Sequence, residues 1–181
     1  LKETYLPKEV KSNDTWNALE KEKFCFEKCD AIVIPGGEST AMSKQIDRNN
    51  LRHSLIEYAK TNSLFGTCAG MILLSSTNES KNLQPLGIMD FTVTRNAYGR
   101  QIESFSDDLQ LDFCDDANFH GVFIRAPKIT IIGKDVQVLS NYANEPVLLS
   151  NGRHLVSAFH PEIGDDFRIH KYFINMVNQN V

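Results

Sequence analysis

The sequence predicts an α/β protein with three layers, in which a mostly parallel central sheet carries helices on both faces. In the first half of the chain, helical and strand-like segments alternate, as they do in parallel α/β sheets. Two short runs, Ala31–Ile34 and Ser63–Phe65, are apolar without alternation, which is typical of strands buried on both faces. In the second half, short strand-like runs follow one another between turn residues, so we expect added antiparallel strands there.

Each element of the first half has its own signal. Asn13-Asp14-Thr15 can cap a helix that runs to about Lys28, with apolar residues near helical spacing. The strand 31–34 ends at Pro35-Gly36-Gly37. Ser39-Thr40 opens a helix as its cap, a second helix covers about 51–61, and a third begins at Ala69 and runs to Ser75.

The second half is predicted to contain seven strands and a closing helix. The strands cover residues 91–94, 109–113, 121–124, 129–132, 136–139, 147–149 and 154–159, and the helix covers 165–178. No repeat, low-complexity tract or linker divides the chain, so we expect a single domain over residues 1–181.

Composition narrows the possible partners. The 181 residues are 41% hydrophobic, and 19 basic residues against 23 acidic ones give a net charge of −4. This balance argues against nucleic acid or an anionic membrane as the partner. No apolar segment is long enough to span a bilayer, and the N-terminus lacks the apolar region of a signal peptide. Four cysteines do not suggest a disulfide framework, so a cytoplasmic, reducing location is expected.

Gly66-Thr67-Cys68-Ala69-Gly70 stands where a strand is predicted to become a helix. The pattern G-x-C-x-G matches a nucleophile elbow with sulfur in place of oxygen. Such a turn strains the central residue and points its side chain out of the sheet. The following helix start favours thiolate and offers the Ala69 N–H to an oxyanion. The alternative is a buried structural cysteine packed between two small residues.

His160-Pro161-Glu162 follows the last predicted strand. Residues i and i+2 of an extended segment point to one side, so Glu162 can orient the His160 imidazole as the base that a cysteine nucleophile needs. The alternative is a solvated pair. No histidine has metal-ligand spacing with a cysteine, and Cys25 and Cys29 lack a second pair, so no metal site is expected.

Together these motifs resemble the class I, triad-type glutamine amidotransferases, which have a flavodoxin-like fold. More narrowly, they are similar to the branch that forms the glutaminase subunit of pyridoxal 5′-phosphate synthase. The resemblance covers roughly residue 29 to the C-terminus. It rests on residues 34–40 (IPGGEST), 65–70 (FGTCAG), 95–101 (RNAYGRQ) with Ser104-Phe105, 123–127 (FIRAP) and 159–162 (FHPE).

The resemblance implies hydrolysis of L-glutamine to glutamate and ammonia, with ammonia delivered to a synthase partner in a hetero-oligomer. Cys68 would attack the amide, His160 would move the protons, Glu162 would hold the imidazole, and no cofactor would be needed. It further implies oxyanion donors in the backbone of Gly37 and Ala69. The glutamine-binding residues that it implies are Gly37, Glu38, Ser39, Arg95, Ile124 and Arg125.

One family feature is absent from the sequence. The family begins with a strand of the form I-G-V-L-x-L-Q-G, and the residues before Cys29 are instead charged and helix-like. We expect that the natural protein has an additional N-terminal piece; the alternative is a truncated, impaired subunit. Two other functions remain open: a non-catalytic binding subunit of the same synthase, and a related cysteine hydrolase acting on peptides or glycated amines.

Overall fold

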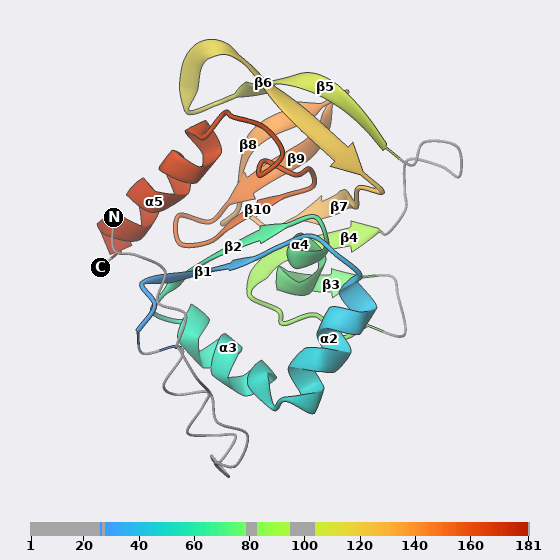
Figure 1. The fold of residues 1–181 in the computed structure, drawn as a ribbon, viewed down its shortest axis with the longest axis vertical. Coiled ribbons are helices and arrows are strands. Elements are labelled where there is room, and N and C mark those ends of the chain that lie inside the picture. Colours follow the sequence, from blue (N-terminus) through green and yellow to red (C-terminus); the bar gives the residue numbers. More distant parts are fainter. Residues whose placement is uncertain (1–25, 27, 79–82, 95–103, 181) are drawn as a thin grey trace.

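Strands from both halves of the chain meet in one five-stranded sheet of the computed structural model, which describes residues 26, 28–78, 83–94 and 104–180 (Figure 1). Its order is β1-β2-β10-β9-β8, and the strands span Ala31–Ile34, Ser63–Thr67, Leu155–Ser157, Glu145–Ser150 and Gln137–Tyr142 respectively. β1, β2 and β10 run parallel, and β9 and β8 add antiparallel pairings. The mixed α/β sheet confirms the predicted fold class.

Helices cover both faces of this sheet. They are α2 (Ser39–Arg48), α3 (Leu51–Ala59), α4 (Ala69–Leu74) and α5 (Arg168–Asn180). The Phe65 ring lies 5.4 Å from the Phe173 ring of α5, whereas a Cβ on Gly66 would meet the Gly70 backbone of α4 at 2.7 Å. Because consecutive strand residues point to opposite faces, α5 and α4 lie on opposite sides of β2. The three-layer arrangement is therefore confirmed.

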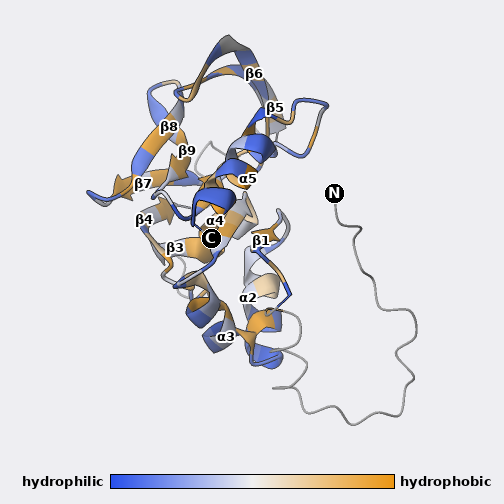
Figure 2. Cartoon of the chain, turned by 90° about the vertical axis from the view of Figure 1, so that its left-hand side faces the viewer, coloured by the Kyte–Doolittle hydropathy of each residue, from blue (hydrophilic) through white to orange (hydrophobic). Residues whose placement is uncertain are grey.

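The remaining strands form two smaller sheets. One has the order β3-β4-β7, from Ser75–Asn78, Met89–Thr94 and Lys128–Ile132, and the other pairs β5 (Ser104–Leu111) with β6 (Cys114–Ile124). The β5–β6 hairpin lies at one end of the molecule and helices α2 and α3 lie at the other end in both views (Figures 1 and 2). The expected antiparallel strands of the second half are thus present, but most of them lie outside the five-stranded sheet.

Two predicted boundaries are wrong. The helix after the cysteine ends at Leu74, because Ser75 is extended (φ −61°, ψ 157°) and its hydroxyl donates to the Ile72 carbonyl. Ser75 instead begins β3, which was not predicted. The expected strand over 109–113 is broken, because Leu111 pairs directly with Cys114 and the two residues between them make the hairpin turn.

β1 is less buried than predicted. Val33 is 54% exposed, and Ala31 and Ile32 are half-buried. Within the described residues β1 pairs only with β2, so one of its edges has no neighbouring strand. Beside it lies an open groove of about 400 Å³, lined mainly by apolar side chains of β1, α2 and α3. The prediction expected both faces of this strand to be covered, whereas Val33 faces the open groove.

The core continues through the layers as one cluster. Its largest fully buried side chains include the rings of Phe65, Phe91, Phe119, Phe123 and Phe159. Hydrophilic residues face outward on α3 and α5 (Figure 2). The predicted helix from Asn13 to Lys28 lies almost entirely outside the described residues. Among the described helices, none combines the length and apolarity needed to cross a membrane.

Candidate active site

The site forms where three neighbouring parallel strands reach their carboxyl ends. β1 leads to Gly36, β2 leads to Cys68, and β10 leads to His160. Parallel pairing brings these ends to one edge of the sheet, which is where α/β proteins place their ligands. β2 lies between the other two strands, so Cys68 occupies the middle of the site.

Cys68 has the strained backbone that the elbow motif predicts, with φ 49° and ψ −102°. Its N–H donates to the Ser157 carbonyl at 2.8 Å, which fixes the turn to the end of β10. The flanking glycines are required by close backbone contacts. A Cβ on Gly70 would lie 1.9 Å from the Ile34 carbonyl oxygen, and one on Gly66 would lie 2.7 Å from the Gly70 backbone.

His160 is held from three directions. Its Nδ1 lies 2.8 Å from Oε1 of Glu162, and its backbone N–H donates to the Val122 carbonyl of β6 at 2.8 Å. Its ring packs on Gly36, where a Cβ would stand 2.4 Å from Cε1. Because Gly36 follows β1 and His160 follows β10, the ring reaches across the end of β2, where Cys68 lies. With Nδ1 engaged by Glu162, Nε2 is the nitrogen left to act as a base.

The surroundings of the Cys68 sulfur favour the thiol form. Sγ lies 3.7 Å from the Ile124 carbonyl oxygen, to which a thiol can donate. Burial raises the pKa of the Cys68 thiol above its ordinary value, the Ala69 N–H opposes this shift, and the Glu162 carboxylate adds to it. The helix start acts in the expected direction, since the Ala69 N–H lowers the pKa, but desolvation outweighs it.

The loop after β1 has a backbone that suits contact with a ligand. Gly37 has a φ of +151°, a conformation that favours glycine. Glu38 caps α2, because its carboxylate oxygens accept from the N–H groups of Thr40 (3.0 Å) and Ala41 (2.6 Å). The cap is thus one residue earlier than predicted, and Ser39 is buried in the first turn of α2.

The remaining predicted site residues divide into two groups. Ile124 lies at the end of β6 and is 39% exposed. Its carbonyl oxygen is the one that lies 3.7 Å from Sγ of Cys68. Arg125 follows it with a left-handed φ of 46°. Arg95 lies outside the described residues, so its predicted place in the site stays a prediction. In the part of the chain that the structure describes, no group of three or more His, Cys, Asp or Glu residues could hold a metal ion.

Sequence reasoning missed three contributors to the site. The carbonyls of Val122 and Ser157 receive the N–H groups of His160 and Cys68, and Gly36 supplies the surface on which the imidazole rests. The first two act through backbone atoms, which leave no side-chain signature in a sequence. The sequence indicated Gly36 only as part of the segment that ends a strand, and no pattern links it to a residue 124 positions away.

Comparison with known proteins gives a consistent result. The family model described as the SNO glutamine amidotransferase family matches residues 7–179. A relative from Oenococcus oeni, named pyridoxal 5′-phosphate synthase subunit PdxT, is 40% identical over 173 residues, which cover 96% of this chain and 90% of that protein. A protein of the same name from Francisella tularensis is 44% identical over 151 residues, covering 83% and 80%.

Solved structures agree with this grouping. A crystal structure described as a glutamine amidotransferase is 35% identical to this chain, with a TM-score of 0.79, and covers 89% of this chain and 93% of that one. A glutamine amidotransferase from Thermotoga maritima has a TM-score of 0.53 at 15% identity, covering 84% of this chain and 64% of that one. The second likeness concerns the fold alone.

Proposed function

The chain belongs to the SNO glutamine amidotransferase family and is a glutaminase that feeds pyridoxal 5′-phosphate synthesis, and we propose that Cys68, His160 and Glu162 are its catalytic triad. One observation carries the assignment. A strained cysteine follows the central parallel strand, and a histidine oriented by a carboxylate extends over the end of that strand. Nucleophile, base and orienting group are thus gathered at one sheet edge.

The reaction begins from the thiol. Nε2 of His160 takes the Cys68 proton as the sulfur attacks the side-chain amide carbon of glutamine. Nδ1 donates to Glu162, which stabilises the imidazolium formed in this step. The negative oxygen of the tetrahedral intermediate accepts from backbone N–H groups, for which we propose Ala69 and Gly37. Burial raises the pKa of Cys68, which agrees with removal of its proton as the sulfur attacks.

The intermediate collapses when His160 returns the proton to the amide nitrogen and ammonia leaves. A γ-glutamyl thioester remains on Cys68. Water, deprotonated by His160, attacks the thioester carbon, and the sulfur leaves and takes back a proton. The balance is one glutamine and one water consumed, and one glutamate and one ammonia released.

Glutamine binding is assigned to the two loops beside the cysteine and to one predicted residue outside the described residues. A carboxylate offers about four acceptor positions, so Glu38 can cap α2 and still receive the substrate ammonium. Ser39 opens the helix that follows β1, and the Ile124 carbonyl, next to Arg125, lies against the Cys68 sulfur. Arg95 is proposed as the cation for the substrate carboxylate, because a guanidinium binds a carboxylate with two parallel hydrogen bonds.

The partner and compartment follow from the same assignment. The relatives are named as subunits of a synthase, so we propose that this chain forms a hetero-oligomer with a synthase subunit that uses its ammonia. A nucleophilic cysteine must be reduced to act, and a reducing cytoplasm is the compartment that we propose for the reaction.

The test compares Cys68→Ala with Cys29→Ala, each assayed for glutamate release with and without the synthase subunit. We expect Cys68→Ala to abolish hydrolysis with an unchanged circular dichroism spectrum, and Cys29→Ala, at an exposed cysteine, to retain it. A glutamine-like electrophile should modify Cys68 alone among the four cysteines. Modification of Cys25 or Cys114 instead would refute the assignment. Binding to the synthase without turnover would favour a non-catalytic subunit, and cleavage of peptides without glutamine turnover would favour another cysteine hydrolase.

A further inference from the structure

Glu162 lies in a loop that is anchored at both ends to the same strand. At one end the His160 N–H donates to the Val122 carbonyl of β6, and at the other Nη2 of Arg168 donates to the Asn118 carbonyl of β6 at 3.1 Å. Between them, residues 162–165 are exposed and have no helix or strand. The position of Glu162 therefore depends on how firmly the two ends are held.

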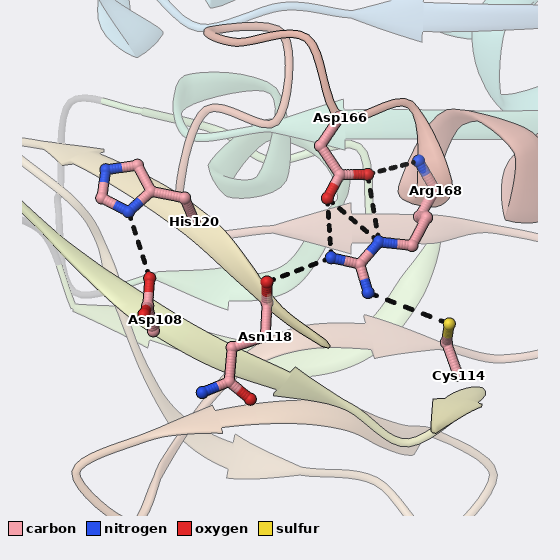
Figure 3. Close-up of polar contacts among 6 residues, drawn as sticks. All are labelled: Asp108, Cys114, Asn118, His120, Asp166 and Arg168. Carbon is pink, nitrogen blue, oxygen red and sulfur yellow. Dashed lines mark hydrogen bonds and ion pairs between the residues drawn. The ribbon is translucent and has the colours of Figure 1, made fainter. Parts of the chain in front are cut away.

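Arg168 holds its end through an unusually complete set of contacts (Figure 3). Its guanidinium forms a forked ion pair with Asp166, with Nη2 to Oδ2 at 2.7 Å and Nε to the two carboxylate oxygens at 3.0 and 3.1 Å. Nη1 points to Sγ of Cys114 at 3.9 Å, and the group lies 5.9 Å from the centre of the Phe119 ring. Asp166 also accepts the Arg168 N–H at 3.0 Å.

The contacts join three parts of the molecule. Asp166 ends the loop that carries Glu162, which we call the catalytic loop, and Arg168 begins α5. Their partners Asn118, Cys114 and Phe119 belong to the β5–β6 hairpin. The hairpin is a separate two-stranded sheet, yet β6 also supplies the carbonyls that receive His160 N–H and face the Cys68 sulfur. A forked arginine contact is directional, so it fixes orientation as well as distance.

Building on the proposed function, we propose that Arg168, clamped by Asp166, is a positioning residue that holds the loop of Glu162 and the strand β6 in catalytic register. Its contacts described above are with Asp166 and β6, so in this proposal it acts through the His160–Glu162 pair. A displacement of a catalytic group by about 1 Å can lower the rate about 100-fold. Loss of a contact at the end of this loop should therefore have a measurable effect on turnover.

The chain offers a matched control. Arg52 forms the same kind of clamp: a forked pair with Asp47 (2.6 and 3.2 Å) and donation to the carbonyls of Gln84 and Pro85. Its side chain is 18% exposed, against 22% for Arg168. Arg52 lies at the start of α3 and has no contact with the catalytic loop in the described residues. Arg52→Gln therefore reports what the loss of such a clamp costs in stability alone.

The experiment is a double-mutant cycle measured on the complex with the synthase subunit. Arg168→Gln, Glu162→Gln and the double variant are assayed for glutamine hydrolysis, beside Arg52→Gln. We expect Arg168→Gln to lower kcat about 10-fold with KM within about twofold, and to have less than about twofold effect when Glu162 is already Gln. Arg52→Gln should leave both constants within about twofold of wild type.

Several outcomes would overturn the inference. An equal loss from Arg168→Gln in both backgrounds would show that Arg168 does not act through Glu162. If Arg52→Gln lowered kcat by as much as Arg168→Gln, the effect of Arg168 would be one of general stability and not of positioning. If Arg168→Gln fails to fold, Asp166→Asn, which weakens the same fork, is taken through the same cycle with the same expectation. Absence of glutaminase activity in the wild-type complex would overturn the proposed function itself, and additivity with an active wild type would overturn only the role of Arg168.

Discussion

The His160 imidazole rests directly on the backbone of Gly36: a Cβ atom at position 36 would lie 2.4 Å from Cε1 of the ring. Gly36 follows β1 and His160 follows β10, and these strands are separated by β2. The contact therefore exists only because the ring spans the end of the central strand. It makes the absence of a side chain at position 36 a requirement for the orientation of the base.

Gly36→Ala should therefore inactivate the enzyme without unfolding it. The new methyl group forces the imidazole away from Cys68, and we expect kcat to fall by about 100-fold. Gly152→Ala is the matched control, since a Cβ there meets nothing within 4 Å but the φ of +82° is unfavourable for alanine. That control should lose about 1 kcal/mol of stability and keep its activity. Glutaminase rates and urea unfolding of both variants measure the contrast; a fully active Gly36→Ala enzyme would contradict this role.

Gly70→Ala should destabilise the protein, although in a helix alanine is normally about 1 kcal/mol more favourable than glycine. A Cβ at this position of α4 would lie 1.9 Å from the Ile34 carbonyl oxygen, and a backbone atom cannot move aside as a flexible side chain can. The helix must shift from β1, and overpacking of this kind costs about 1–3 kcal/mol. Urea unfolding measures the midpoint. A higher midpoint than wild type would show that α4 and β1 are less closely packed than described.

The resting state of Cys68 can be read from alkylation as a function of pH. Burial raises the pKa of its thiol, so at neutral pH the free enzyme holds the protonated form. The iodoacetamide rate at the Cys68 peptide, followed by mass spectrometry, should rise only above the usual cysteine pKa of about 8.5. Cys68→Ser, which lacks the reactive peptide, controls for other sites. An inflection below pH 7 would indicate a resting thiolate–imidazolium pair instead.

His154 should make the protein less stable in mild acid. It is buried, and its Nδ1 accepts the Leu64 N–H at 3.2 Å, so the neutral ring is favoured. Desolvation, with a contribution from Arg153, lowers the pKa of His154 to about 4. The unfolded chain binds this proton near pH 6.5, so stability is complete above that pH and is lost as pH falls toward 4, by about 3 kcal/mol from this group.

The check is urea unfolding between pH 7 and pH 4 for wild type and His154→Asn. Asparagine offers an acceptor for the Leu64 N–H but does not titrate. The variant should therefore lose less stability than wild type between pH 7 and pH 4. Parallel curves for the two proteins would assign the acid sensitivity to carboxyl groups elsewhere.

Several elements could be predicted because their signals are local. The run Ala31–Ile34, the helix opened after Gly37 and the cysteine elbow all depend on neighbouring residues, and each is found where the sequence places it. The two errors have different causes. Val33 lines an open groove beside β1, so its exposure depends on how the strand packs against other segments. The strand over 109–113 is interrupted by a tight hairpin turn, in which Leu111 pairs with Cys114 only three residues later.

The sequence by itself determined the chemistry available: a cysteine on a sharp turn, a histidine two residues before a glutamate, and an alternation of elements that favours a parallel sheet. Only the tertiary structure decided the order β1-β2-β10, which brings the strand ends before Cys68 and His160 to one edge of the sheet, and the burial that raises the pKa of the thiol. The reason is physical. Propensity and turn geometry act over a few residues, whereas strand order, close backbone contacts and desolvation arise between segments about a hundred residues apart and have no local signature.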